Sequence, residues 1–390
     1  MVSRDSRTKK NSLPPIKQNR GKSLAVRQYI LDTFSPGDWL PPEHDIAKSL
    51  QVTRYAVTRA LNDLHSQGQV VREPGRGTKY TGARQSPDRI NPQHTAKTYV
   101  FISTELSSVL AIGLISALER ELGERNCRLA LRSTDHKSSL EMTRIGELQT
   151  GGFSGAIIVS DNVQQIQNEI LRLHEGGFPL VLMDRLQPGL RVPSVATDHF
   201  AGAVAVVSHL ISLGHKRIAH ITFGGVWHES HAVKLRHEGY QFALRSAGIQ
   251  PEDSLIAYLD LPEGNASPDT QRSELSAYIA MHKLLASQSP PTAVFAVNDF
   301  LCEGIVLAAT NHGLKIPDQL SLAGFDYDAY IAPNNLSLTT YAHPIKELAH
   351  AAAEILLASA AGLRPSVDPV VIPGRLVLGN STSVLSCKEL

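Results

Sequence analysis

Polar and charged side chains follow a series of short apolar runs in the second part of the sequence. Asp184 and Arg185 come after PLVLM, Asn298 and Asp299 after TAVFAV, and Asp326 after SLAGF. If these runs are parallel strands, their carboxyl ends meet at the sheet edge where α/β folds bind ligands. Guanidinium, amide and carboxylate groups would there offer a small molecule donors and acceptors in fixed directions. The candidate positions are 103–105, 133–135, 160–161, 184–185, 223–227, 298–299 and 326.

A second set of side chains, near the amino terminus, suits nucleic acid. Arg54, Tyr55, Thr58 and Arg59 stand in the first turns of a helical pattern. A helix that enters the major groove reads base edges with its first residues. Arginine is the side chain best suited to guanine, and threonine contacts a base or a phosphate. Thr53, at the helix start, is placed to cap the helix and to meet a phosphate.

The sequence of the first quarter of the chain predicts the helices and strands that would position these side chains. SLAVRQYILDTF suits a helix capped by Ser23, and SPGDWLPP ends it. EHDIAKSL predicts a second helix, QVT a turn, and RYAVTRALNDLHSQG a third helix packed by Val57, Leu61 and Leu64. QVVRE and TKYTG predict two strands. This order describes a winged helix-turn-helix over residues 23–81.

The turn PGRG between those strands predicts a basic wing. Arg76 stands between Gly75 and Gly77, and the two glycines allow a tight turn and a close approach of backbone to DNA.

The charge distribution along the chain agrees with an amino-terminal head that binds a polyanion. Residues 1–97 carry 17 Lys/Arg against 8 Asp/Glu, whereas the remainder carries 21 against 29. The alternative is a solvated surface without a partner.

From Thr98 the pattern changes to alternating strands and helices. Residues 1–22 predict a disordered basic tail, and residues 82–97 a linker. Short apolar runs then suit strands buried on both faces of a parallel sheet, with helical patterns between them. The fold class is therefore α/β, with doubly wound parallel sheets following the winged helix-turn-helix. The predicted strands are YVFIS, RLALRS, AIIVS, PLVLMD, RIAHITF, TAVFAVND and SLAGFD.

The sequence contains no signature of common catalytic sites. GxSxG, GxxxxGK[ST] and HExxH are absent, and His228 and His231 are one position too close for the zinc helix. The three cysteines are far apart and form neither CxxC nor a zinc pattern. No apolar stretch is long enough for a membrane span, and the amino terminus has no secretory apolar segment. We therefore expect a cytoplasmic protein that is not an enzyme, with no cofactor and no metal.

The head resembles the DNA-binding domain of the GntR family. LPPEHDIAKSLQVTRYAVTRALNDLHSQGQVVREPGRGTKY follows the family pattern over about residues 23–80. Two positions depart from it: His44 replaces an arginine that touches DNA in the family, and Thr58 replaces another common arginine. The resemblance implies operator contacts by Thr53, Arg54, Tyr55, Thr58, Arg59, His44, Gly75, Arg76 and Gly77.

The body resembles the sensor domain of the LacI/GalR family over about residues 98–390. VPSVATDHFAGAVAVVSHLISLGHKRIAHITF, KLRHEGYQFALRSAGI and the ND, GFD and LTT signatures recur in order. The resemblance implies a periplasmic-binding-protein-like fold, a small-molecule cleft between two lobes, and a dimer. It places one lobe at about 98–195 and 342–369 and the other at about 196–341 and 370–390. The combination of head and body resembles arabinose-type repressors.

The same resemblance assigns an effector site suited to a sugar. Arg236 resembles the arginine that grips the effector, and Asp299 the aspartate that accepts from hydroxyls; a salt-bridged scaffold is the alternative for both. Trp227, Phe200 or Tyr327 would cover an apolar ring face. At two family aromatic positions this chain has Leu110 and Ala111, so effector identity does not transfer. The expected effector contacts are Arg185, Arg236, Asn298, Asp299, Asp326, His343, Trp227, Glu105 and Asp135.

These features together predict a repressor that a sugar-like effector releases from operator DNA. A sugar-binding protein or a sugar-handling enzyme without a regulatory role is the alternative. Product formation from candidate sugars would identify the enzyme, and failure to bind DNA would exclude the repressor.

Overall fold

The computed structural model describes residues 19–66, 69–73, 76–82, 96–160, 163–225, 230–259, 271–326, 331–332 and 335–385. The chain divides into a head, up to Thr95, and a body that begins at Ala96. Most of the predicted tail and linker, together with Gly75, Trp227 and Tyr327, lies outside the described residues. No helix in the described part of the chain is long and apolar enough to cross a membrane.

The head is three helices followed by a two-stranded hairpin, as predicted. They are α1 (Asn19–Thr33), α2 (Glu43–Ser49), α3 (Arg54–Ser66), β1 (Val70–Glu73) and β2 (Gly77–Tyr80). The predicted inward face of α3 is confirmed, because Val57, Leu61 and Leu64 are at most 1% exposed. The Ala56 N–H donates to Thr53 Oγ1 at 3.3 Å, which confirms the cap. The predicted cap at Ser23 is wrong, because α1 already begins at Asn19.

The body contains two six-stranded sheets, and its α/β prediction is confirmed. The first sheet has the order β15-β7-β6-β5-β3-β4, and every ladder in it is parallel. Its strands are β3 (Thr98–Ser103), β4 (Arg128–Ser133), β5 (Gly155–Ile158), β6 (Leu180–Met183), β7 (Ser194–Thr197) and β15 (Val370–Ile372). All residues of β5 and β6 are buried, as expected for strands covered on both faces.

The second sheet has the order β16-β14-β11-β10-β8-β9, with β16 antiparallel to β14. Its strands are β8 (Ile218–Phe223), β9 (Ile256–Leu259), β10 (Ala293–Ala296), β11 (Ser321–Asp326), β14 (Thr339–Ala342) and β16 (Arg375–Val377). A separate pair is formed by β12 (Ile331–Ala332) and β13 (Leu336–Ser337), and a short helix η1 (Asp253–Leu255) precedes β9.

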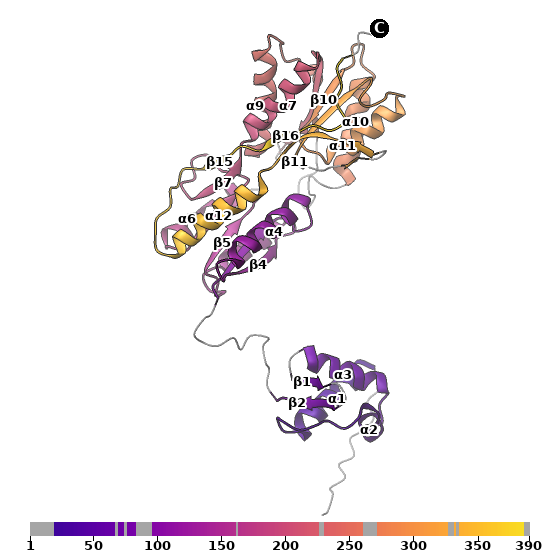
Figure 1. Cartoon of the computed structure of the whole chain (residues 1–390), viewed down its shortest axis with the longest axis vertical. Coiled ribbons are helices and arrows are strands. Elements are labelled where there is room, and N and C mark those ends of the chain that lie inside the picture. Colours follow the sequence, from indigo (N-terminus) through magenta and orange to yellow (C-terminus); the bar gives the residue numbers. More distant parts are fainter. Residues whose placement is uncertain are drawn as a thin grey trace, which may run out of the picture. The chain divides into compact units, whose positions relative to one another are not determined.

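Helices cover both faces of each sheet, so each sheet lies within its own core. On the first sheet, α4 (Val109–Gly123) and α12 (Ile345–Ala360) share one core, while α5 (Ser138–Gly146) and α6 (Val163–Glu175) cover the other face. On the second, α7 (His199–Ser212) and α9 (His231–Ser246) lie opposite α10 (Gln271–Leu285) and α11 (Leu301–Asn311) (Figure 1). We call the two sheets with their helices the N-lobe and the C-lobe.

The chain passes between these lobes three times. It leaves the N-lobe after β7, returns after β14, and leaves again between β15 and β16. The predicted boundaries at 195 and 369 fall too early. Thr197 pairs with Ile372 at the end of a parallel ladder, so both β7 and β15 still belong to the N-lobe.

Candidate DNA-binding surface and effector pocket

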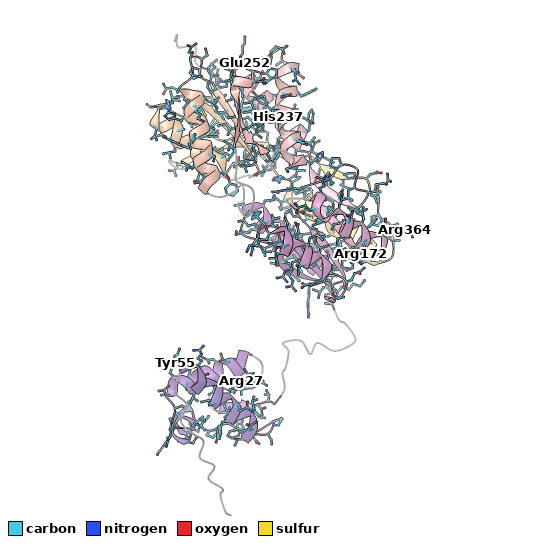
Figure 2. The ribbon with its side chains drawn as sticks, turned by 180° about the vertical axis from the view of Figure 1, so that it is seen from behind. Arg27, Tyr55, Arg172, His237, Glu252 and Arg364 are labelled. Carbon is cyan, nitrogen blue, oxygen red and sulfur yellow. The ribbon has the colours of Figure 1, made fainter. Side chains whose placement is uncertain are left out.

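The amino-terminal end of α3 presents exposed side chains to solvent. Tyr55 is 71% exposed and lies at the edge of the head (Figure 2), and the Arg54 side chain is 77% exposed. Arg59 is exposed as well, and so is His44, whose side chain is 73% exposed. Exposed side chains at a helix start can reach into a groove of DNA.

The Glu43 carboxylate connects the starts of α2 and α3 to the hairpin. Thr58 Oγ1 donates to Glu43 Oε2 at 2.7 Å, and Arg54 Nε lies 3.7 Å from the same oxygen. Arg72 of β1 lies 3.7 Å from Glu43 Oε1 and donates to Asn62 at 2.9 Å. The Thr58 hydroxyl is therefore engaged inside the head. Glu43 was not among the residues identified from the sequence, because a carboxylate is not expected at a phosphate-binding surface.

The hairpin turn requires glycine at Gly77. Its φ is +111°, a conformation that L side chains rarely adopt, and Gly77 pairs with Glu73 at the end of the ladder. Arg76, next to it, is exposed at the tip. The described part of the hairpin thus has the geometry expected of a wing that carries a cation.

A pocket lies between the N-lobe and the C-lobe. Its walls combine charged, hydroxyl and apolar side chains from both lobes. The predicted residues Glu105, Arg185, Arg236, Asn298, Asp326 and His343 all line it. Leu110 and Ala111 line it too.

Two predicted effector residues lie elsewhere. Asp299 is completely buried behind the wall, where it accepts from Thr340 Oγ1 at 2.9 and 3.0 Å. A Cβ at Gly324 would lie 1.9 Å from its Oδ1, so the carboxylate is packed against the backbone of β11. Asp135 is exposed and accepts from Ser133 Oγ at 2.5 Å. In this structure neither residue lines the pocket.

The aromatic side chains in the pocket come from one position outside the predicted candidates, Phe101, and from one within them, Phe223. Phe101 of β3 and Phe223 of β8 line it, whereas Phe200 packs against Phe242 with the ring centroids 5.4 Å apart. His136 also lines the pocket and lies 3.5 Å from Glu105. His136 was not predicted as a pocket residue, because it follows β4 at a φ of +54°, where no side-chain pattern marks its direction.

Arg236 is the centre of a buried polar cluster in the C-lobe wall. Its Nη2 lies 2.8 Å from Asp326 Oδ1, and Nη1 donates to the Val297 carbonyl at 2.6 Å. Its guanidinium carbon lies 3.7 Å from the centroid of the Phe325 ring, an arrangement that adds cation–π attraction. Asn298 Oδ1 accepts the Leu301 N–H at 3.3 Å, which leaves its amide hydrogens for the pocket.

Asp326 is ionised although its side chain is only 13% exposed. Burial by itself would raise the pKa of this carboxyl group. The Arg236 charge and the hydrogen bond from His343, at 3.1 Å, outweigh burial and lower the pKa below its ordinary value. His343 Nδ1 in turn lies 2.6 Å from Thr197 Oγ1, at the end of β7. This chain of contacts joins the C-lobe wall to the N-lobe.

The lowered pKa of Asp326 predicts an acid-dependent stability. A carboxyl whose pKa is lower in the folded state stabilises the fold above its ordinary pKa of 3.8, and this is lost as pH falls through the lowered pKa. We expect Asp326→Asn to remove part of the fall in unfolding free energy as the pH drops below about 4. Denaturant unfolding of both proteins across this range measures it. Parallel curves for wild type and variant would contradict the assignment.

Both parts of the chain match known families. The model for bacterial regulatory proteins of the gntR family matches residues 24–79, and the periplasmic binding protein-like domain matches residues 207–382. The arabinose metabolism transcriptional repressor of Geobacillus stearothermophilus is 26% identical over 385 residues, which is 93% of this chain and 97% of that protein. The transcriptional repressor CytR of Escherichia coli is 25% identical over 343 residues, 87% of this chain and 96% of that protein.

Solved structures agree with these matches. A LacI family transcriptional regulator from Enterococcus faecium with bound ribose is 26% identical, with a TM-score of 0.60 over 74% of this chain and 100% of that one. The complex of the regulator CelR with cellobiose has the same TM-score over 94% of this chain and all of that one, at 21% identity, and shows the fold alone. The chain therefore joins a DNA-binding domain of the gntR family to a periplasmic-binding-protein-like body of the kind found in LacI-family regulators.

Proposed function

We propose that this protein is a transcription repressor that leaves its operator when a sugar-like effector binds between the lobes. One observation carries the proposal. The same chain has an exposed start of the helix α3 and a pocket to which both lobes contribute charged and polar side chains. The relatives named above as repressors cover nearly the whole chain, and one similar structure contains ribose. The pocket's hydrogen-bonding groups and its phenylalanine rings suit a molecule with hydroxyl groups and an apolar face.

The mechanism requires an effector that binds the two conformations of the body unequally. A molecule that contacts Glu105 and Arg185 in the N-lobe and Arg236 and Asn298 in the C-lobe favours the closed arrangement. Closure changes the arrangement of a dimer and hence of its two heads, so operator affinity falls. By linkage, operator DNA then weakens effector binding by the same factor.

Operator binding is expected to depend steeply on salt. Measuring affinity for fragments of the protein's own promoter region, with and without pentoses and hexoses, tests the function directly. With six to ten phosphate contacts, affinity should fall by about 10³–10⁵ between about 50 and 200 mM salt. Failure to bind duplex DNA at low salt would overturn the proposal. Conversion of a sugar to product would favour the enzyme alternative.

The C-lobe offers an apolar surface for a second copy of the chain. Leu275 and Ile279 of α10 are 58% and 45% exposed, and Leu307 of α11 is 54% exposed. The helices approach closely here, since a Cβ at Gly304 would lie 2.0 Å from the Glu274 carbonyl oxygen. Exposed apolar side chains on adjoining helices are typical of subunit interfaces. A dimer would place two heads on a two-fold symmetric operator.

A charge at this surface is expected to separate the dimer. Leu307→Asp would bury an unpaired carboxylate in the interface, which is strongly unfavourable. Sedimentation velocity should show the variant as a monomer, with weaker operator binding, while Leu363→Asp, at a residue 65% exposed after α12, should stay dimeric. A dimeric Leu307→Asp protein would exclude this interface.

A further inference from the structure

His199 is a buried histidine that does not line the pocket yet contacts two residues that do. It is the first residue of α7, directly after the chain leaves β7 for the C-lobe, and it is 1% exposed. Arg236, from the C-lobe wall, lies on one side of its ring. Asp184, which follows β6 in the N-lobe wall, lies on the other side. The ring therefore stands between the two walls of the pocket.

The contact with Arg236 fixes the protonation of this ring. Arg236 Nε and Nη2 lie 3.4 and 3.3 Å from His199 Nδ1. A guanidinium group has only donors, so Nδ1 must accept and cannot carry a hydrogen. Burial and the Arg236 charge lower the pKa of His199, although Asp184 opposes them. His199 is thus neutral at neutral pH, with its single ring N–H at Nε2.

That N–H faces a carboxylate at a distance slightly too long for a hydrogen bond. His199 Nε2 lies 3.5 Å from Asp184 Oδ1, and neither atom has another hydrogen-bond partner in the structure. An ordinary N–H···O bond is about 2.9–3.0 Å long. Both atoms are buried, and leaving a buried donor and acceptor apart is unfavourable. A small approach of the two lobes would complete the bond.

We propose that His199 is a positioning residue of the effector switch, which holds the Arg236 guanidinium through Nδ1 and bonds Asp184 through Nε2–H when the lobes close. The inference rests on the proposed function and adds to it a contact that couples the occupied pocket to lobe closure. Nδ1 would govern how tightly effector binds, and Nε2 how strongly binding changes operator affinity.

Two amide variants separate these roles. The asparagine amide reaches about as far as Nδ1, so His199→Asn keeps an acceptor for Arg236 and loses the donor to Asp184. The glutamine amide reaches about as far as Nε2, so His199→Gln keeps that donor and loses the acceptor. His215→Asn is the matched control: His215 is also a buried C-lobe histidine, bonded to Thr292 and Ser321, and it does not line the pocket.

The measurements are effector affinity and the factor by which saturating effector weakens operator binding. For His199→Gln we expect effector affinity to fall about tenfold or more, as for the loss of one hydrogen bond to a charged group. For His199→Asn we expect effector affinity within about threefold of wild type and the coupling factor reduced about tenfold. The control should lower the melting temperature without changing either value. Equal losses of affinity and coupling in both His199 variants would mean a purely structural role and overturn the proposal.

NMR spectroscopy tests the protonation of the His199 ring. In protein with ¹⁵N-labelled histidine, the His199 signals, identified by their absence in the variants, should show bare Nδ1 and protonated Nε2. The Nε2–H proton should move downfield when effector binds. A ring protonated at Nδ1 in the unliganded protein would overturn the inference even if the protein is a repressor. If no sugar releases the operator, the proposed function fails, and the ring signals still decide whether His199 holds Arg236.

Discussion

Arg236→Ala is expected to weaken the response to effector while operator binding stays intact. The guanidinium lies in the pocket wall, held in one orientation by Asp326 and the Val297 carbonyl. An effector that takes hydrogen bonds from this cation loses about 1.5–3 kcal/mol for each bond removed. One N–H of the guanidinium is left for an effector, and losing that bond corresponds to roughly a tenfold to hundredfold loss of affinity. Titration calorimetry with the effector and a gel-shift assay with operator measure the two functions separately.

The control for Arg236→Ala must account for Asp326, the partner of the guanidinium. Removing the guanidinium leaves the Asp326 carboxylate buried without its cation, and breaking such a pair costs about 3–5 kcal/mol of stability. Operator binding should therefore be measured below the melting transition of the variant. Arg172→Ala removes an arginine paired with Glu169 on the exposed side of α6 (Figure 2) and should change neither function. Retained effector affinity in folded Arg236→Ala would contradict the assigned role.

The periodicity of apolar residues predicted most of the buried elements, and those largely position the two sites; the buried strands β7 and β14 were not predicted. Val57, Leu61 and Leu64 were predictable because they repeat on one helix face, and β5 and β6 because they are buried on both sides. The edge strands β15 and β16 were not predictable in this way, although the edge strand β4 was. β15 and β16 have three residues each and are mostly exposed or half-buried, so no apolar run marks them.

The sequence predicted which strand ends contribute residues to the pocket, but it did not predict the direction in which each side chain points. Asn298 and Asp299 are neighbours after β10, yet the first lines the pocket and the second bonds Thr340 behind it. A strand-end pattern does not distinguish them, because consecutive side chains point to different sides. His199 could not be identified from the sequence for another reason. Its importance depends on Arg236 and Asp184, which only the folded lobes bring to either side of it.

Arg54→Ala is expected to reduce specific operator binding by about 1–3 kcal/mol while effector affinity stays unchanged. The side chain extends from the first position of α3 and is mostly exposed, and its contact with Glu43, at 3.7 Å, is too long to be a strong restraint. An exposed ion pair of this kind contributes little to stability. The guanidinium can therefore leave Glu43 for a guanine edge or a phosphate when DNA approaches.

The two kinds of DNA contact give different results for the Arg54 variant. If Arg54 reads a base, its loss weakens operator binding more than binding to a scrambled duplex, and one operator position becomes tolerant of substitution. If it contacts only phosphate, both duplexes weaken equally and the salt dependence becomes shallower by about one ion. Fluorescence anisotropy with the two duplexes, at several salt concentrations, separates these outcomes. Unchanged affinity for both duplexes would exclude the amino-terminal end of α3 from the interface, since Arg54 is among its most exposed side chains.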